Sequence, residues 1–190
     1  MRRQKSKRTT QVILVSFIAF IMIASVIGFI WDGSQKIKYN GFSFENNGNS
    51  YTSVINKKQF SFNFLPQDVE YISIDNEIAS RISDAVQIDT TSDINDTNKD
   101  IIALAQYNIN QVLIENSIYL RQGFTANNTF NLPIITCNDA TANVPVLYFK
   151  TSGQNMISSE NNCIIIEAEE AIDFIQVKDR LLYSMLGVIR

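Results

Sequence analysis

Hydrophobic residues form one long run near the start of the chain and alternate with polar residues farther on. The run covers residues 12–31 and contains no charged side chain. A helix of about 20 residues is about 30 Å long, which matches the hydrocarbon core of a bilayer. Trp31 ends the run, where an indole ring prefers the membrane interface. We therefore predict an uncleaved transmembrane signal anchor at residues 12–31, through which the chain would bind the lipid bilayer.

A cleaved secretory signal peptide is the main alternative interpretation of this run. Signal peptides have an apolar core of about 7–15 residues, followed by a cleavage site with small residues. Here the run is longer, and the small residues Ala24 and Ser25 lie inside it. A buried helix of a soluble protein is the other alternative, but nothing in the run supplies a polar face.

Alternation of apolar and polar residues begins between residues 37 and 65. We predict a three-stranded antiparallel meander with strands at 37–45, 50–55 and about 60–64, joined by turns at 46–49 and 56–58. Alternate positions carry phenylalanines: Phe42, Phe44, Phe60, Phe62 and Phe64. We interpret them as the apolar face of a sheet packed against helices. A ligand-binding aromatic platform is the alternative.

The remaining chain mixes helical periodicity with short apolar runs. Helices are predicted at 76–83, at 99–116 and from Glu169 or Glu170 to Leu186, the last with Arg180 on its solvent face. Short strands are predicted at 71–74, 86–89, 119–124, 132–136, 144–150 and 163–167, and a polar loop at 90–98. Interspersed helices and strands predict an outer domain of the α+β class, a mixed α/β sandwich, without defining the strand order.

Charge is divided unevenly along the chain. Five basic residues and no acidic ones precede residue 32, whereas residues 32–190 contain 11 basic and 19 acidic residues. Basic residues favour the cytoplasmic side of a span. They predict a cytoplasmic tail at 1–11, the anchor at 12–31 and an extracytoplasmic domain at 32–190, entered through a short polar hinge at 32–35. The acidic domain lacks the clustered Lys and Arg of a nucleic-acid binder.

Residues able to carry chemistry are few. The chain has no histidine, which excludes Ser-His-Asp catalysis, Cys-His catalysis and His-ligated zinc. The aspartates between residues 89 and 100 lack the spacing and glycine of a calcium loop, and no P-loop or dinucleotide-binding glycine pattern occurs. The acidic residues at 167, 169 and 170 are interpreted as a solvated face and helix start. We predict no catalytic, metal or cofactor site.

Cys137 and Cys163 are the only cysteines, and both belong to the predicted extracytoplasmic domain. An even number in an oxidising compartment predicts one disulfide. A redox-active pair is an alternative, although such pairs usually have C-x-x-C spacing; two free buried thiols are another. The polar segment 136–141 is interpreted as an Asx-type turn that orients the disulfide, with a binding rim as the alternative.

Two N-x-S/T sequons occur in polar segments of the predicted outer domain. Their acceptors are Asn95 and Asn127. Such sequons are candidate glycosylation sites only on the outer side of a membrane. They also occur by chance in a chain rich in asparagine, so both interpretations stay open.

The order of these segments resembles a group of small uncharacterised single-pass membrane proteins from archaeal genomes, especially reduced-genome lineages. The resemblance covers most of the chain and implies no activity and no site residue. The segments that carry it, after the basic tail and anchor, are YNGFSF at 39–44, FLP at 64–66, LPIITCNDAT at 132–141, CII at 163–165 and DRLLY at 179–183.

We therefore expect a membrane-anchored extracytoplasmic binding or structural domain, a subunit or accessory of an envelope assembly with a membrane or envelope protein as its partner. A sheet edge or the aromatic meander is the expected contact surface. The alternatives are an extracytoplasmic ligand-binding sensor domain and a carboxylate-dependent hydrolase of envelope polymers. A hydrolase would need two acids about 5–10 Å apart in a cleft.

Overall fold

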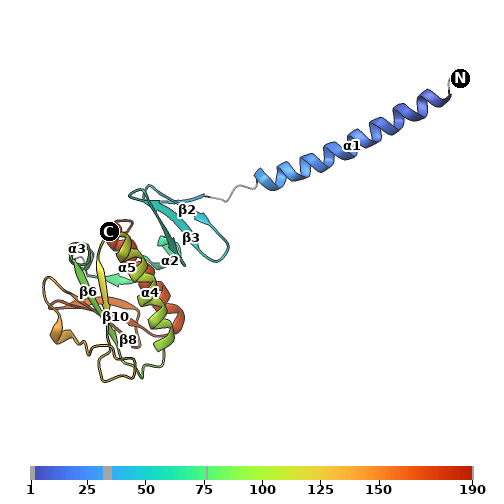
Figure 1. Cartoon of the computed structure of the whole chain (residues 1–190). Coiled ribbons are helices and arrows are strands. Elements are labelled where there is room, and N and C mark those ends of the chain that lie inside the picture. Colours follow the sequence, from blue (N-terminus) through green and yellow to red (C-terminus); the bar gives the residue numbers. More distant parts are fainter. Residues whose placement is uncertain (1–2, 32–35, 76, 190) are drawn as a thin grey trace. The chain divides into compact units, whose positions relative to one another are not determined.

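The computed structural model describes residues 3–31, 36–75 and 77–189. The chain divides into two compact units, Met1–Gln35 and Lys36–Arg190, each of which is described by itself (Figure 1). The predicted hinge at 32–35 lies outside the described residues.

The first unit contains one helix, α1 (Arg3–Trp31). Side chains of this helix are described for residues 11–26, and all of them are exposed. Among the described residues, none of the helices has the length and apolar character needed to cross a membrane. The transmembrane helix predicted at 12–31 is therefore not confirmed.

The second unit begins with a meander of four antiparallel strands in sequence order. They are β1 (Lys36–Tyr39), β2 (Phe42–Asn46), β3 (Tyr51–Ile55) and β4 (Lys58–Phe62). The prediction of three strands was wrong, because the strand expected at 37–45 folds back at Asn40 and Gly41. These two residues have φ values of 45° and 85°, as a type I′ hairpin turn requires, and Asn-Gly is the preferred pair for that turn.

A second, six-stranded sheet has the order β5-β9-β10-β8-β6-β7. The strands β10, β8, β6 and β7 are parallel to one another, and β9 is antiparallel to β10. The mixed α+β class is thus confirmed. The elements are α2 (Pro66–Val69), β5 (Ser73–Ile74), α3 (Ile78–Ser83), β6 (Gln87–Ser92), α4 (Lys99–Glu115), β7 (Tyr119–Gln122), the 3-10 helix η1 (Cys137–Asp139), β8 (Val146–Thr151), β9 (Met156–Glu160), β10 (Cys163–Ala168) and α5 (Ala171–Met185).

Three predictions about this sheet were wrong. The polar loop predicted at 90–98 begins inside β6, because Thr90, Thr91 and Ser92 are buried in a strand that pairs on both sides. The strand predicted at 132–136 is a loop with a single bridge, Phe124 to Ile134. Strand β9 was missed, because its sequence MISSE is too polar to stand out.

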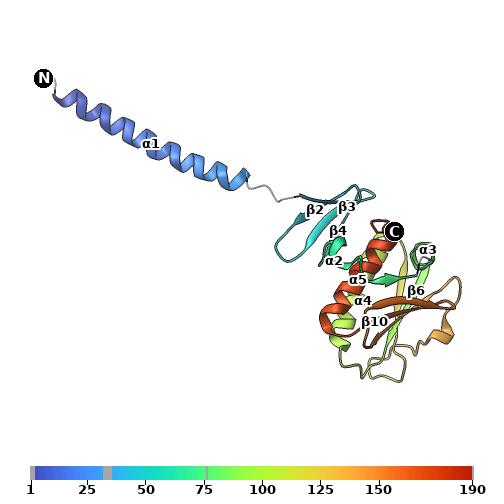
Figure 2. The ribbon, with the colours of Figure 1, turned by 180° about the vertical axis from the view of Figure 1, so that it is seen from behind.

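Helices α4 and α5 lie side by side on one face of this sheet (Figures 1 and 2). Alternate residues of the central strands point toward them, including Leu147, Phe149, Ile164 and Ile166, all 1% exposed or less. The meander joins the same core through Phe44 and Phe62, whose rings lie 5.9 Å and 4.2 Å from the ring of Tyr183. Interpreting the phenylalanines as a core face is confirmed for the buried Phe44, Phe60 and Phe62.

Helix α5 buries three consecutive charged residues, Lys178, Asp179 and Arg180, which are 1%, 0% and 5% exposed. The predicted solvent position of Arg180 was therefore wrong. Asp179 Oδ2 accepts hydrogen bonds from the N–H groups of Asn63 and Phe64, at 2.8 and 2.9 Å, and Asp179 Oδ1 pairs with Lys178. Arg180 Nε donates to the carbonyl of Ile72 at 3.1 Å.

Through these contacts Asp179 holds Asn63 and Phe64, the residues that follow β4, against helix α5. Burial raises the pKa of Asp179 above its usual value, and this effect outweighs the opposing effect of Lys178 and the two N–H groups. Charged groups are tolerated inside a protein when they are paired and hydrogen-bonded.

Candidate functional site

The other face of the six-stranded sheet has no α-helix among the described residues. A loop of residues 123–145, which we call the stapled loop, lies there instead. Its Ile135 side chain is 1% exposed and packs with Val146 of β8 and Cys163 of β10; Pro145 at the end of the loop is also buried. This small apolar cluster holds the loop against the strands.

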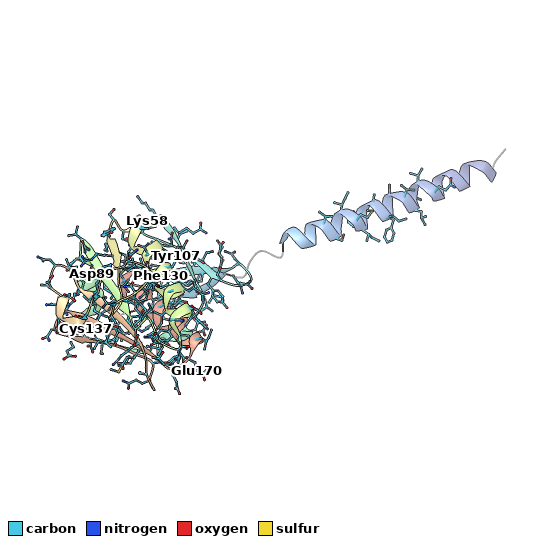
Figure 3. All side chains as sticks on the ribbon, turned by 60° about the horizontal axis from the view of Figure 1, so that its bottom comes forward. Lys58, Asp89, Tyr107, Phe130, Cys137 and Glu170 are labelled. Carbon is cyan, nitrogen blue, oxygen red and sulfur yellow. A yellow bond between two sulfur atoms is a disulfide. The ribbon has the colours of Figure 1, made fainter. Side chains whose placement is uncertain are left out.

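A disulfide joins the stapled loop to the sheet. Cys137 and Cys163 are bonded, with their Cα atoms 5.1 Å apart, so the predicted disulfide is confirmed (Cys137 is labelled in Figure 3). The two cysteines are 26 residues apart in sequence. The chain-entropy estimate for a bridge of that span is about 3–4 kcal/mol of stabilisation.

Hydrogen bonds join the middle of the stapled loop to β6 and to the start of the loop. Thr91 Oγ1 in the buried strand β6 donates to the carbonyl of Ile135 at 2.7 Å, and the N–H of Ile135 donates to the carbonyl of Phe124 at 2.9 Å. Gly123 allows this close approach. A Cβ at that position would lie 2.6 Å from the carbonyl oxygen of Pro133 and 2.7 Å from the Ile135 side chain.

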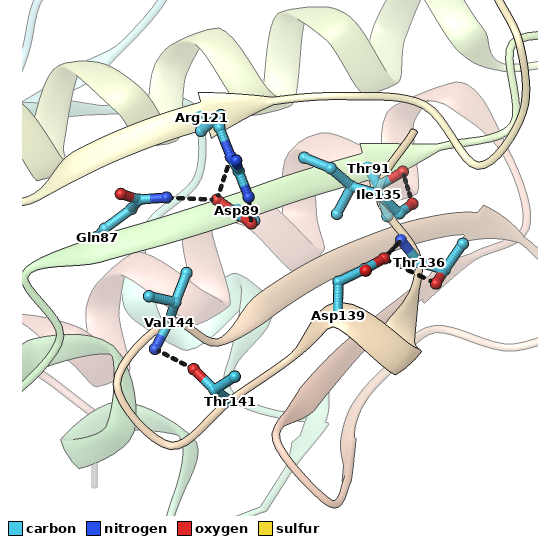
Figure 4. A network of polar contacts seen from close by, with 9 residues as sticks. All are labelled: Gln87, Asp89, Thr91, Arg121, Ile135, Thr136, Asp139, Thr141 and Val144. Carbon is cyan, nitrogen blue, oxygen red and sulfur yellow. Dashed lines mark hydrogen bonds and ion pairs between the residues drawn. The ribbon is translucent and has the colours of Figure 1, made fainter. Parts of the chain in front are cut away.

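The segment 136–141 is a turn built around η1, as Figure 4 shows. Asp139 Oδ2 accepts hydrogen bonds from Thr136 N at 2.8 Å and Thr136 Oγ1 at 2.9 Å. These bonds lower the pKa of the exposed Asp139 below its usual value. The segment is a turn beside the disulfide, as expected, but Asp139 bonds back to Thr136 as in a capping box, so the Asx type that the sequence suggested was wrong.

A buried carboxylate lies next to this turn on the same sheet face. Asp89 of β6 is 1% exposed and pairs with Arg121 of β7, whose Nε donates to it at 2.9 Å and whose Nη2 also contacts it. Gln87 Nε2 donates to the same carboxylate at 2.9 Å (Figure 4). The hydrogen bonds to Asp89 raise the pKa of Arg121. The Arg121 side chain is 47% exposed, so it remains accessible from solvent.

Sequence reasoning missed the Asp89–Arg121 pair. Their pairing follows from the parallel register of β6 and β7, in which the two residues are direct neighbours. The sequence held a hint, because each residue is the one charged position within a segment predicted as a strand. Without the strand order, however, nothing indicated that the two runs are adjacent.

Among the described residues, three carboxylates are buried, and each has its own cation. Asp89 pairs with Arg121, Glu167 with Lys150 at 3.1 Å, and Asp179 with Lys178. Asp89 and Glu167 share a sheet face, but two strand spacings and four residues separate them, about 16 Å. Asp179 belongs to α5, on the opposite face. This arrangement does not match the spacing that carboxylate-dependent hydrolysis uses.

The stapled loop exposes three large apolar side chains among its polar ones. Phe130 is 65% exposed, Ile134 51% and Leu132 37%, and the ring of Phe130 lies 5.9 Å from that of Phe124. Large apolar side chains on a rigid support are typical of protein-binding surfaces. Arg121 of β7 is a further part-exposed side chain near the loop's turn on this sheet face.

Both predicted glycosylation acceptors have exposed side chains. Asn127 belongs to the stapled loop, and Asn95 lies in the turn between β6 and α4. Their use as acceptors stays a prediction.

Within the described ranges, no group of three or more His, Cys, Asp or Glu side chains could hold a metal ion. Comparison of the chain with family models, curated proteins and solved structures finds no match. The resemblance to archaeal single-pass membrane proteins thus remains an untested expectation.

Proposed function

We propose that this chain is a membrane-anchored binding domain of the cell envelope. Residues 12–31 anchor it, with the N-terminus in the cytoplasm, and residues 36–190 bind a protein partner outside. The stapled loop is the contact surface. The observation that carries the proposal is this rigid loop, covalently tied to the sheet, which presents Phe130, Leu132 and Ile134 outward.

The anchor is supported by the exposure of apolar side chains along α1, whereas the second unit buries its apolar side chains in a core. The large apolar side chains described between Val12 and Val26 are 50–69% exposed; Figure 3 draws them as sticks. The uncharged run continues through residues 27–31, whose side chains lie outside the described residues. Leaving so much apolar surface in water is unfavourable, and a bilayer removes that cost.

The orientation is supported by charge and by the disulfide. Five basic residues precede the uncharged run, which favours a cytoplasmic N-terminus. Disulfides persist in oxidising compartments and are rare in the cytosol, so the Cys137–Cys163 bond fits a domain outside the membrane.

Contact through the stapled loop is tested by site-specific photocrosslinking in native membranes. A photoreactive residue replaces Phe130 in the full-length chain, and a control carries it in place of Leu104, a 46%-exposed position on α4. We expect a discrete protein adduct from position 130 and none from position 104. Equal adducts from both positions, or none from position 130, would contradict the assigned contact surface.

The topology is tested on the same cells with a membrane-impermeant lysine reagent. Lys57 and Lys58 should react in intact cells, whereas Lys5 and Lys7 should react only after the membrane is opened. The opposite pattern would refute the orientation.

A further inference from the structure

A second surface suited to binding lies between the last strand of the meander and helix α4. It is a groove of about 420 Å³, a volume in the range of ligand pockets. Its lining residues are Gln59, Phe60, Ser61, Asn63, Asn108, Gln111, Val112, Glu115, Lys178 and Leu182. Of these, the buried Phe60, Val112, Lys178 and Leu182 form the floor.

One side of the groove is the free edge of β4. The hairpin between β3 and β4 turns at Asn56 and Lys57, with φ values of 51° and 66°, which identifies a two-residue type I′ turn. Such a turn makes the flanking pair, Ile55 and Lys58, a hydrogen-bonded pair. Antiparallel pairs then alternate, so the N–H and C=O groups of Gln59 and Ser61 point away from β3, toward the free edge.

Nothing in the described part of the chain hydrogen-bonds the main chain of Gln59 or Ser61 at this edge. An unpaired edge with alternating donors and acceptors is a template for one more strand. Asn63, the next residue in that alternation, is already occupied, because its N–H donates to Asp179 at 2.8 Å. The open length therefore covers residues 59–61.

The other side of the groove is α4, which limits what can enter. Lys58 Nζ contacts the carbonyl of Glu115 and ties the start of β4 to the end of the helix. Asn108 and Gln111 face the edge strand across the groove. Because a helix stands where further strands would lie, the edge has room for one extended segment and not for another sheet.

The chemistry of the lining indicates an uncharged occupant. Neutral amide and hydroxyl side chains dominate both walls, from Gln59, Ser61, Asn63, Asn108 and Gln111, and these groups complement the peptide main chain. The cation at the floor, Lys178, is already paired with Asp179 and donates to Asn63 Oδ1 at 3.0 Å. A negatively charged occupant would lose hydration here without gaining a free counter-ion, and a positively charged one would find a single carboxylate, Glu115, at the end of α4.

We propose that the groove between β4 and α4 binds an extended, uncharged segment of a partner protein, which adds a fifth strand to the meander. This inference rests on the proposed function in taking the occupant to be a protein. It assigns a second contact, separate from the stapled loop, whose affinity comes from main-chain hydrogen bonds to Gln59 and Ser61.

The test measures peptide binding by fluorescence anisotropy, using the full-length chain in nanodiscs. The probe is a labelled Thr-Val-Thr-Val-Thr peptide with blocked ends. A second probe has N-methyl groups on alternate amides, and a third has Asp in place of each Thr. We expect saturable binding of the first probe, at least about tenfold weaker binding of the third, and none of the second, which lacks the necessary N–H groups.

Two proline variants make the test specific for this edge. Ser61→Pro removes a free-edge N–H of β4 without breaking a bond to β3. Lys38→Pro is the control, because the N–H of Lys38, like that of Ser61, points away from the neighbouring strand, here on β1, the opposite edge strand. We expect Ser61→Pro to weaken binding at least about tenfold and Lys38→Pro less than about twofold. Thermal unfolding of both variants verifies that they are folded.

The proposal is overturned if the first probe does not bind, if Ser61→Pro binds it as wild type does, or if both prolines weaken binding equally. Self-association of the chain that Ser61→Pro abolishes would also overturn it, because the occupant would then be a second copy. These readouts use purified protein and are independent of the crosslinks at position 130, so failure of either proposal can be recognised separately.

Discussion

The two faces of the six-stranded sheet are covered in different ways. One face lies under α4 and α5, whose apolar stripes bury most of the core, including Leu147, Phe149 and Ile164. The other face carries a loop with one fully buried apolar side chain, Ile135, and a disulfide. We call α4 and α5 the helical cover and the stapled loop the loop cover. The helical cover is stabilised by burial of apolar area, whereas the loop cover depends on a covalent bond and a few polar contacts.

This difference affects which apolar side chains are used for packing and which stay available for binding. A helix bound through its apolar stripe has already used that stripe, although α4 also exposes Leu104, Tyr107 and Ile114 on its other side. The stapled loop buries little and keeps Phe130, Leu132 and Ile134 at its surface. A disulfide permits this, because it stabilises the loop without requiring those side chains to be buried.

The largest effect is expected from the buried charges under the helical cover. Asp179→Ala leaves the Lys178 ammonium buried without its carboxylate and removes the acceptor for two N–H groups. We expect a loss of about 3–5 kcal/mol in the free energy of unfolding, measured by chemical denaturation. Asp173→Ala at the start of the same helix is the control, with an expected loss of about 1 kcal/mol. Equal losses would mean that the buried pair has no special role.

Removing the disulfide tests the loop cover. The double variant Cys137→Ser, Cys163→Ala should lower the free energy of unfolding by about 3–4 kcal/mol. Hydrogen exchange should then lose protection first at the amides of Phe124 and Ile135, while the amides of α5 remain protected. Loss of protection spread evenly over both covers would contradict the distinction between them.

Gly123 tests the close approach of the loop to β7. A Cβ there would lie 2.6 Å from the Pro133 carbonyl oxygen, whereas a Cβ at Gly153 would meet nothing within 4 Å. We expect Gly123→Ala to cost about 1–3 kcal/mol of unfolding free energy. Gly153→Ala should change it by less than about 1 kcal/mol. Similar values for the two variants would show that the loop can shift without cost.

The smallest effect is expected where the two covers meet, at the carboxyl ends of β6 and β8. Burial tends to raise the pKa of Asp96, but the hydrogen bonds it accepts from Thr151 and Asn98 lower that pKa below its usual value. An acid whose folded pKa is lowered stabilises the fold above its unfolded pKa, near about 3.9, and this contribution disappears as the pH falls through the folded pKa.

Asp96→Asn should therefore be less stable than the wild type at pH 7, and the difference should shrink toward pH 3. Because Asp96 is largely solvated, we expect less than about 1 kcal/mol. Denaturant titrations of both proteins at the two pH values measure it. A difference that does not vary with pH would assign the effect to the side-chain amide instead of the charge.

The elements that the sequence predicted well are those with a strong local signal. Helix α4 lies within one residue of its predicted bounds, and α5 begins near Glu169–Glu170 as expected, because a 3.6-residue apolar period needs no distant partner to be recognised. The cysteine pair was also predictable, since only one pairing of two cysteines exists.

The elements that were missed depend on distant partners. Strand β9 is polar but pairs with both β5 and β10, and Thr90–Ser92 form strand because neighbours on both sides supply hydrogen bonds. The candidate sites could not be predicted from the sequence either. The outward placement of Phe130 and the free edge at Gln59 and Ser61 follow from which strands are neighbours.

By itself, the sequence determined the uncharged run at 12–31, the placement of the long helices, the mixed α+β class of the second unit and the disulfide, because composition, periodicity and a single cysteine pair can be read without the strand order. Only the tertiary structure decided the strand order, the pairing of Asp89 with Arg121 and the burial of Lys178, Asp179 and Arg180. A charged residue is stable inside a protein only when a distant partner satisfies it, and the sequence does not state which partner the fold will bring near.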